Sequence, residues 1–462
     1  MIQLKKQFIW IAPFISAILA ISLYSMSVAP AVNIVASTTL LCALWWIFEP
    51  IPIPITSLIP LTVFTMTGVL SSTQVANAYG HPIILLLLGG FILSQSMAYS
   101  GAHRRIALLM VNCFGSSSPK HLIMGFMTAA AVLSMWISNT ATTLMLLPVA
   151  LATVESTNHK GLTTSLLLGI AYAASIGGIG TPIGTPPNAL FMSTYNEVTG
   201  NSLSFLDWMA LAIPLVIIFI PLAMLWITRG LPESLDLQIP KTGQWSAIEK
   251  RVLLVFLITA ILWITRQQPF GGWSDLTGLT QANDASIALL ACISMFIIPD
   301  GKSVNGKQGK LLNWESASKI PWGVLLLFAG GICIAKAFAE SGLSQIIGAG
   351  LTDIVGLPTI ILIALIALTV TFLTEMTSNT ATTALLMPIL AAGAMAADID
   401  PMLLMVPAAM SASCAFMLPV ATAPNAIVYG SNHIEIQQMV RKGFVLNLIG
   451  IILVSSVCYI LI

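Results

Sequence analysis

The chain has 462 residues, of which 57% are hydrophobic and only 8% charged, with a formal net charge of +1 and a mean hydropathy of +0.94. Soluble domains carry about 25% charged residues, so this composition excludes a soluble protein. The apolar runs are continuous, whereas a membrane β-barrel would alternate apolar and polar residues along each strand. We therefore predict an all-α membrane protein that crosses the bilayer many times.

Eleven apolar segments are candidates for transmembrane helices, since about 20 residues cross a bilayer. The first lies within residues 1–30. More spans follow it and no small-residue cleavage site clearly does, so we expect a transmembrane helix there and not a signal peptide. In chain order, the predicted spans lie near residues 8–27, 32–48, 52–70, 83–99, 162–195, 208–228, 251–264, 285–298, 321–339, 403–430 and 443–462.

Two further apolar regions, 121–155 and 357–394, are each interrupted near the centre by the polar sequence Ser-Asn-Thr. Each region has about 35 residues, so each arm has about 15–17, at or below the minimum that crosses a bilayer. We predict that each region forms a re-entrant helical hairpin, which enters and leaves the membrane on the same side. The expected total is about 11 transmembrane helices plus two hairpins.

The basic residues indicate the orientation, because Lys and Arg concentrate in cytoplasmic loops. If Lys5 and Lys6 are cytoplasmic, sixteen of the eighteen basic residues fall on that side; Arg266 falls outside and Lys336 lies within a span. We therefore predict a cytoplasmic N-terminus, a cytoplasmic linker at 229–250 and an extracytoplasmic C-terminus. The other basic residues placed in the cytoplasm are Arg104, Arg105, Lys120, Lys160, Arg229, Lys241, Lys250, Arg251, Lys302, Lys307, Lys310, Lys319, Arg441 and Lys442.

The interruption is part of an internal repeat. SNTATTLMLLPV at 138–149 and SNTATTALLMPI at 378–389 share eight identical positions, and the segments 85–101 and 324–342 also match. The predicted topology brings the first hairpin in from the cytoplasm and the second from outside. The chain thus divides into two inverted-topology repeats, 31–228 and 251–462, an architecture that permits alternating access.

Each Ser-Asn-Thr copy ends one apolar arm and begins the next, so its residues suit the N-terminus of the new helix. An open helix N-terminus carries a partial positive charge and free N–H donors, which suit a carboxylate or another anion. The preceding arm ends in unpaired carbonyls, and oxygens without a full carboxylate charge suit Na⁺. The first copy adds side-chain oxygens from Ser134 and Asn139, and the second copy repeats the pattern with Thr374, Ser378, Asn379 and Thr380.

A second pair of polar breaks follows the hairpins, GTPPN at 184–188 and ATAPN at 421–425. Gly184 permits an unwound backbone, Thr185 can cap a helix, and Pro186 fits the first helical position. We predict that the helices at 162–195 and 403–430 are each broken in two at membrane depth. A hairpin tip and a broken helix in each half would form two oxygen cages around one anion site, as in a cation-coupled anion carrier.

The remaining polar residues leave some alternatives open. Glu375 lies deep in the second hairpin, where an ion-binding role and a structural hydrogen-bonding role are both reasonable, and Lys336 could pair with it or extend to the interface. The sequence contains no GxxxxGK[ST], HExxH or nucleophile-elbow motif. We therefore expect no enzyme activity, organic cofactor, transition metal or nucleic-acid partner.

The Ser-Asn-Thr copies, the breaks, WWIFEPIPIPITSLIP at 45–60 and FLTEMTSNTATT at 372–383 together resemble the divalent anion:sodium symporter family over almost the whole chain. The resemblance implies a homodimer in which a transport domain moves like an elevator against a scaffold domain. It implies one sodium site at Ser134, Ser138, Asn139 and Gly184, and another at Thr374, Ser378, Asn379 and Ala421. The substrate would meet Ser138, Asn139, Thr140, Ser378, Asn379 and Thr380, helped by Thr185 and Thr422.

We expect Na⁺-coupled symport of C4-dicarboxylates such as succinate, malate or fumarate across a bacterial inner membrane, with two or more Na⁺. Ala423 departs from the family's pattern because it replaces the usual first proline of the second break, which leaves the selectivity open. The alternatives are a dicarboxylate or citrate exchanger, a sulfate or tricarboxylate carrier of the same family and, from a different class, an anion channel.

Overall fold

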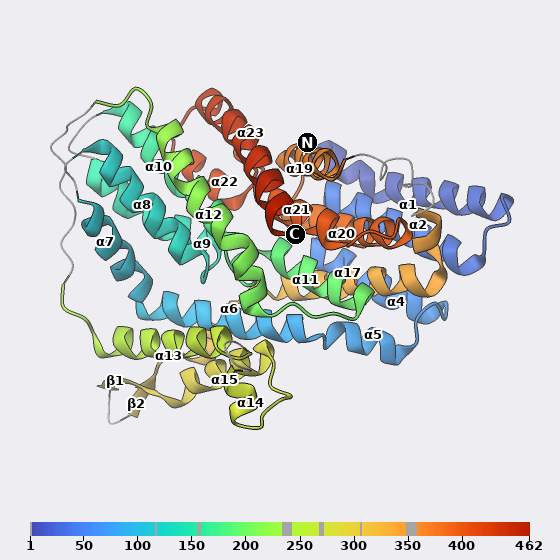
Figure 1. The fold of residues 1–462 in the computed structure, drawn as a ribbon, viewed down its shortest axis with the longest axis horizontal. Coiled ribbons are helices and arrows are strands. Elements are labelled where there is room, and N and C mark those ends of the chain that lie inside the picture. Colours follow the sequence, from blue (N-terminus) through green and yellow to red (C-terminus); the bar gives the residue numbers. More distant parts are fainter. Residues whose placement is uncertain are drawn as a thin grey trace.

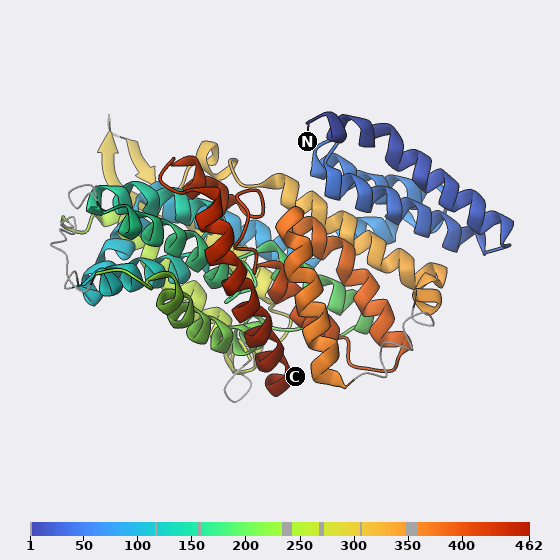
Figure 2. The same ribbon diagram turned by 90° about the horizontal axis from the view of Figure 1, so that it is seen from above.

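The computed structural model describes residues 2–115, 118–154, 159–232, 243–267, 272–304, 307–347 and 358–462. In these residues the fold is almost entirely helical, as predicted (Figures 1 and 2). In both views α1, α2 and α4 lie at one end of the elongated molecule and α7, α8 and α10 at the other, with α23 crossing the region between them.

In the first half, helices cover the predicted spans, and two further helices, α5 and α7, lie outside them. The helices of this half are α1 (Ile2–Ser25), α2 (Pro30–Phe48), α3 (Ile53–Thr56), α4 (Leu58–Met66), α5 (Ser72–Tyr79), α6 (Pro82–Ser100), α7 (Ala102–Phe114), α8 (Pro119–Ser134), α9 (Asn139–Val154), α10 (Lys160–Gly178), α11 (Pro186–Thr199) and α12 (Phe205–Ile227).

The second half contains helices and one short ribbon. Its elements are α13 (Ala247–Ile264), α14 (Gly272–Leu276), α15 (Asp284–Ile297), β1 (Pro299–Val304), β2 (Lys307–Lys310), α16 (Trp314–Ala317), α17 (Trp322–Ser341), α19 (Thr359–Met376), α20 (Asn379–Ala396), α21 (Met402–Ala412), α22 (Ala423–Gly430) and α23 (Ile436–Leu461).

Nine helices among the described residues are long and apolar enough to cross a membrane. Each of the eleven predicted spans contains at least one helix, and both predicted hairpins are helix pairs, α8 with α9 and α19 with α20. Residue 155 at the end of the first hairpin, residue 357 at the start of the second and part of the linker 229–250 lie outside the described residues.

The antiparallel ribbon of β1 and β2, which pairs Pro299 with Lys310 and Val304 with Lys307, was not predicted. The sequence analysis only places the lysines of this stretch in the cytoplasm and predicts no strand there. The sequence holds Asn-Gly at 305–306, which is a strong hairpin signal, although the pattern of long apolar spans does not reveal it.

Both broken helices are present, with different lengths of unwound chain. The first break separates Gly178 at the end of α10 from Pro186 at the start of α11. The second separates Ala412 at the end of α21 from Ala423 at the start of α22, so it begins well before the ATAPN sequence that predicted it. The sequence marks where each second half-helix starts because Pro suits a first helical turn. It carries no comparable signal for the end of α21.

Close packing fixes the first break against the first hairpin. A Cβ atom on Gly177 of α10 would overlap the backbone of Ala131 in α8, so glycine is what lets these helices touch. Almost every residue of α10 is buried. Similarly, a Cβ on Gly443 of α23 would overlap Phe416 in the second break. Each break therefore lies against a close backbone contact and has a defined position.

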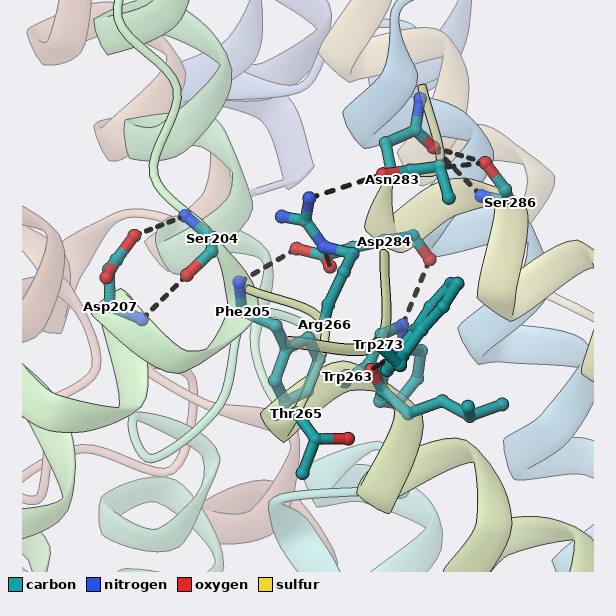
Figure 3. A network of polar contacts seen from close by, with 12 residues as sticks. Ser204, Phe205, Asp207, Trp263, Thr265, Arg266, Trp273, Asn283, Asp284 and Ser286 are labelled. Atoms are coloured by element: carbon teal, nitrogen blue, oxygen red, sulfur yellow. Dashed lines mark hydrogen bonds and ion pairs between the residues drawn. The ribbon is translucent and has the colours of Figure 1, made fainter. Parts of the chain in front are cut away.

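A polar network joins the start of α12 to α13 and α15 (Figure 3). Asp284 accepts hydrogen bonds from the Phe205 backbone N–H at 2.8 Å and from Arg266 Nε at 2.6 Å. Trp263 Nε1 donates to the Asp284 carbonyl at 3.0 Å, and its ring stacks on Phe205 at 4.3 Å between centroids. Trp136, just after α8, stacks on the Trp263 ring at 6.3 Å, so the network also reaches the first hairpin.

Candidate functional site

A cavity of about 580 Å³ lies where the two hairpin tips and the two breaks meet. Ten of the twelve predicted site residues line it, so segments far apart in the sequence come together as the repeat predicts. These ten are Ser138, Asn139, Thr140, Gly184, Thr185, Ser378, Asn379, Thr380, Ala421 and Thr422.

The other two predicted site residues, Ser134 and Thr374, are fully buried beside the cavity. Ser134 Oγ donates to Asn139 Oδ1 at 2.5 Å, and Thr374 Oγ1 donates to Asn379 Oδ1 at 2.8 Å. The same contact thus occurs in both hairpins. It fixes the side-chain carbonyl of each motif asparagine and leaves that oxygen a second lone pair.

Four helices begin at this cavity. The helices α9 and α20 start at Asn139 and Asn379 of the hairpin tips, and α11 and α22 start at Pro186 and Ala423 of the breaks. The first turn of a helix has unpaired N–H groups and a partial positive charge. Four such ends around one cavity favour an anion.

The capping hydroxyls differ between the halves. Ser138 Oγ accepts from the Ala141 N–H at 3.3 Å, and Thr422 Oγ1 accepts from the Asn425 N–H at 3.2 Å. Thr185 and Ser378 are the N-cap residues of α11 and α20, but neither side chain makes a capping bond. Thr185 therefore takes the expected N-cap position, but its hydroxyl makes no capping hydrogen bond.

Two buried asparagines that the prediction left out of the site hold the breaks together. Asn188 Nδ2 donates to the carbonyls of Gly178 at 2.9 Å and Thr181 at 2.7 Å. Asn425 Nδ2 donates to the carbonyls of Ala415 and Leu418, both at 3.1 Å. The two amides thus bind matching positions of the two unwound segments and satisfy carbonyls that no helix pairs. Their place as the last residue of GTPPN and of ATAPN was the signal that could have identified them.

Hydroxyl groups tie each hairpin to the break beside it. Thr181 Oγ1 in the first break donates to the Met135 carbonyl at the end of α8. In the second half the bond runs the other way, from Thr374 Oγ1 of α19 to the Ala412 carbonyl at 3.2 Å. Each hairpin tip is therefore coupled to its own break, although different residues make the two links.

The structure shows a hydrogen-bonding role for Glu375. Its carboxylate accepts from the backbone N–H groups of Phe416 at 2.7 Å, Met417 at 2.8 Å and Leu418 at 3.0 Å, and from Asn447 Nδ2 at 2.8 Å. These N–H groups belong to the long unwound segment of the second break. Glu375 is thus an acceptor that replaces missing helical hydrogen bonds.

Lys336 does not pair with Glu375. Its Nζ lies 2.6 Å from Glu197 Oε1, so the lysine bridges α17 and α11. The sequence could not reveal this pair because the two residues are far apart in the chain and lie in different repeats.

Residues of α6 and of the segment before α17 also line the cavity. Ser94 and Gln95 of α6 line it, together with Ile320 and Lys319. Among the described residues lining the cavity, Lys319 carries the one charged side chain. The lysine is exposed, and sequence reasoning used it only as an orientation marker.

Comparisons with known proteins agree with this geometry. The family described as "Sodium:sulfate symporter transmembrane region" matches residues 5–460. The sodium-dependent dicarboxylate transporter SdcS of Staphylococcus aureus strain NCTC 8325 is 40% identical over 447 residues, covering 92% of this chain and 85% of the relative. SdcS of the bovine strain RF122 is 39% identical over the same lengths.

Two solved structures share the fold at low sequence identity. The YdaH transporter of Alcanivorax borkumensis has a TM-score of 0.60 at 14% identity, covering 86% of this chain and 87% of that one. MtrF of Neisseria gonorrhoeae has a TM-score of 0.57 at 14% identity, covering 87% and 84%. The family match, the relatives and the duplicated motifs agree: the chain belongs to the sodium:sulfate symporter family, the divalent anion:sodium symporters.

Proposed function

We propose that the protein is a secondary active transporter that couples the inward flow of Na⁺ to uptake of C4-dicarboxylates such as succinate, malate or fumarate. The observation that carries the proposal is the convergence of two matched hairpin–break pairs on one cavity. The SdcS relatives, described as sodium-dependent dicarboxylate transporters, support this substrate class.

Each hairpin–break pair would hold one Na⁺. The first site would use Ser134, Ser138, Asn139 and Gly184, and its backbone is closely packed: a Cβ on Gly178 would lie 2.6 Å from Asn139 Oδ1. The second site would use Thr374, Ser378, Asn379 and Ala421. Hydroxyl, amide and backbone carbonyl oxygens provide ligands without a full negative charge, a set that suits Na⁺ in transporters.

The substrate would lie between the two sodium sites. One carboxylate would meet Ser138, Asn139 and Thr140, and the other would meet Ser378, Asn379 and Thr380. Thr185 and Thr422 would add hydroxyl donors. Two bound Na⁺ and four helix N-termini would offset the two negative charges of the dicarboxylate, so sodium would have to bind for the anion to be held.

The composition of the cavity lining supports an elevator mechanism. The lining combines the hairpins and broken helices with α6 and the segment before α17. We propose that the hairpins and broken helices belong to a transport domain that slides against a scaffold domain, which would expose the cavity to each side in turn. We also propose a homodimer, a cytoplasmic N-terminus and an extracytoplasmic C-terminus.

Ligand binding to the purified protein tests the substrate class. Thermal unfolding is followed with succinate, citrate and sulfate, in Na⁺ and in an equal concentration of choline. We expect succinate to stabilise the protein in Na⁺ and to have little effect in choline. Stabilisation by sulfate or citrate alone would mean that this anion, and not a dicarboxylate, is the substrate. Equal stabilisation in choline would contradict the sodium coupling.

A further inference from the structure

A second cavity, of about 460 Å³, lies where the start of α10, the end of α12 and the start of α23 meet. Arg229, Arg441 and Lys442 line it together with Trp226. Among its described lining residues there is no Asp or Glu, and this lining shares no residue with that of the cavity at the hairpin tips. Three cations and no acid around one cavity suit an anion.

Lys442 is held in a fixed position at the back of this cavity. Its Nζ donates to the Ile227 carbonyl at 2.7 Å and to Ser165 Oγ at 2.9 Å. An ammonium group has three protons, so one donor remains for a ligand. In addition, Trp226 Nε1 donates to the Lys442 carbonyl at 2.9 Å, which joins α12 to α23 beside the cavity.

The two arginines form the outer part of the same cavity. The Arg229 guanidinium lies 5.2 Å from the centroid of the Trp226 ring, a cation–π contact that orients it without using its donors. Arg441 is exposed. The structure records no ion pair for Arg229, Arg441 or Lys442 with a carboxylate of the described residues. Guanidinium groups bind phosphate through two parallel hydrogen bonds, so this pair favours a phosphate group.

The surface next to the cavity favours a lipid over a free phosphate. Leu222 and Leu225 lie on one face of α12 and are 38% and 56% exposed, and Arg229 follows two residues after the end of this helix. Phe444 and Leu448 lie on the same face of α23 as Arg441 and are 43% and 39% exposed. On each helix, an apolar face thus leads directly to a basic residue. An anionic phospholipid matches both parts, with its phosphate in the cavity and its acyl chains along the apolar faces.

We propose that this cavity binds the headgroup phosphate of an anionic phospholipid. Phosphatidylglycerol and phosphatidylcholine both carry a phosphate, but only phosphatidylglycerol has a net negative charge for the three cations. The site lies on the side where the basic residues predict the cytoplasm. A bound lipid would join the ends of α10, α12 and α23 and hold them at the level of the headgroups.

The test compares lipid binding to the intact protein and to two charge variants. Phosphatidylglycerol is titrated into delipidated protein in detergent, and binding is measured by native mass spectrometry and by the rise in unfolding temperature. The variant R229Q/R441Q removes both arginines and keeps Lys442, which also pairs with the end of α12. The control R104Q/K120Q removes the same charge from exposed residues elsewhere on the predicted cytoplasmic side.

We expect phosphatidylglycerol to bind the intact protein and the control with equal affinity and to bind R229Q/R441Q roughly ten- to thirtyfold more weakly, since each basic residue near a headgroup adds attraction. Phosphatidylcholine should bind all three proteins weakly and alike. The proposal is overturned if both double variants lose equal affinity, if phosphatidylcholine competes equally, or if inorganic phosphate alone stabilises the protein as much as the lipid does. Equal stabilisation of intact protein and R229Q/R441Q by Na⁺ with succinate confirms that the variant is folded.

Discussion

At the scale of single residues, the two halves use different side chains for the same task. The long second break has N–H groups that no helix pairs, and Glu375 accepts three of them. The matching position of the first hairpin is Met135, whose backbone carbonyl makes the link to the shorter first break. The sequence identified Asn139 and Asn379 because they are duplicated. It could not assign Glu375, because the role depends on an unwound segment that has no counterpart motif.

Replacing Glu375 tests its structural role. Glu375→Gln keeps the shape but replaces one acceptor oxygen by an NH₂ group, which cannot accept from the backbone N–H groups it faces. A buried donor left unpaired costs about 1–3 kcal/mol. We expect a lower unfolding temperature and roughly tenfold weaker Na⁺ binding, measured by thermal shift. Glu315→Gln, at an exposed site, is the control, and an unchanged unfolding temperature in Glu375→Gln would refute the structural role.

Replacing Lys319 should weaken binding of the anion and leave Na⁺ binding unchanged. It carries the one charge among the described residues lining the cavity and belongs to neither of the proposed sodium sites. Because the side chain is exposed and screened by salt, we expect Lys319→Gln to weaken succinate binding only about two- to fivefold, most clearly at low ionic strength. Na⁺ binding should match that of the intact protein. The control is Lys250→Gln, and an equal loss there would show a general charge effect.

At the scale of helices and hairpins, apolar runs and helix-starting residues predicted most of the elements. Long apolar runs predicted the helices, and Ser-Asn-Thr and Pro marked where helices start, because these residues suit a first turn. Where helices end was harder to predict, since nothing in the sequence marks Ala412 as the end of α21. The β1–β2 ribbon was missed because it is short and polar.

The contact between α12 and the α13–α15 region provides a prediction at this scale. Arg266 and Asp284 form a largely buried ion pair, with side chains 12% and 10% exposed. Removing one member leaves a buried charge unpaired, which costs about 3–5 kcal/mol. We therefore expect Arg266→Leu to destabilise the protein strongly and the double variant Arg266→Leu/Asp284→Asn to regain part of that loss.

The measurement is a double-mutant cycle of the free energy of unfolding in mixed detergent micelles. Asp284→Asn is the second single variant of the cycle. Asp284 also accepts the Phe205 N–H, which asparagine can still do through its side-chain oxygen. A double variant whose loss equals the sum of the two single losses would mean that the pair is not coupled.

At the scale of the whole molecule, the internal repeat was the most informative feature of the sequence. It predicted that residues from both halves meet at one site, and ten of the twelve predicted site residues line one cavity. The lining from α6 and from the segment before α17 was not predicted, because the matched segment 85–101 that holds Gln95 contains no helix break and Lys319 lies outside the matched segments. Which residues bind Na⁺ and which bind the anion stays a prediction.

The central claim is that Na⁺ binding at the two motifs drives accumulation of a dicarboxylate. Its most direct test is uptake of labelled succinate into empty proteoliposomes under an inward Na⁺ gradient, with the intact protein, Asn139→Ala and Asn379→Ala. We predict accumulation only with the intact protein and only with Na⁺, while both variants remain folded. Uptake that is independent of Na⁺, uptake confined to vesicles preloaded with succinate, or normal kinetics in either variant would contradict the account.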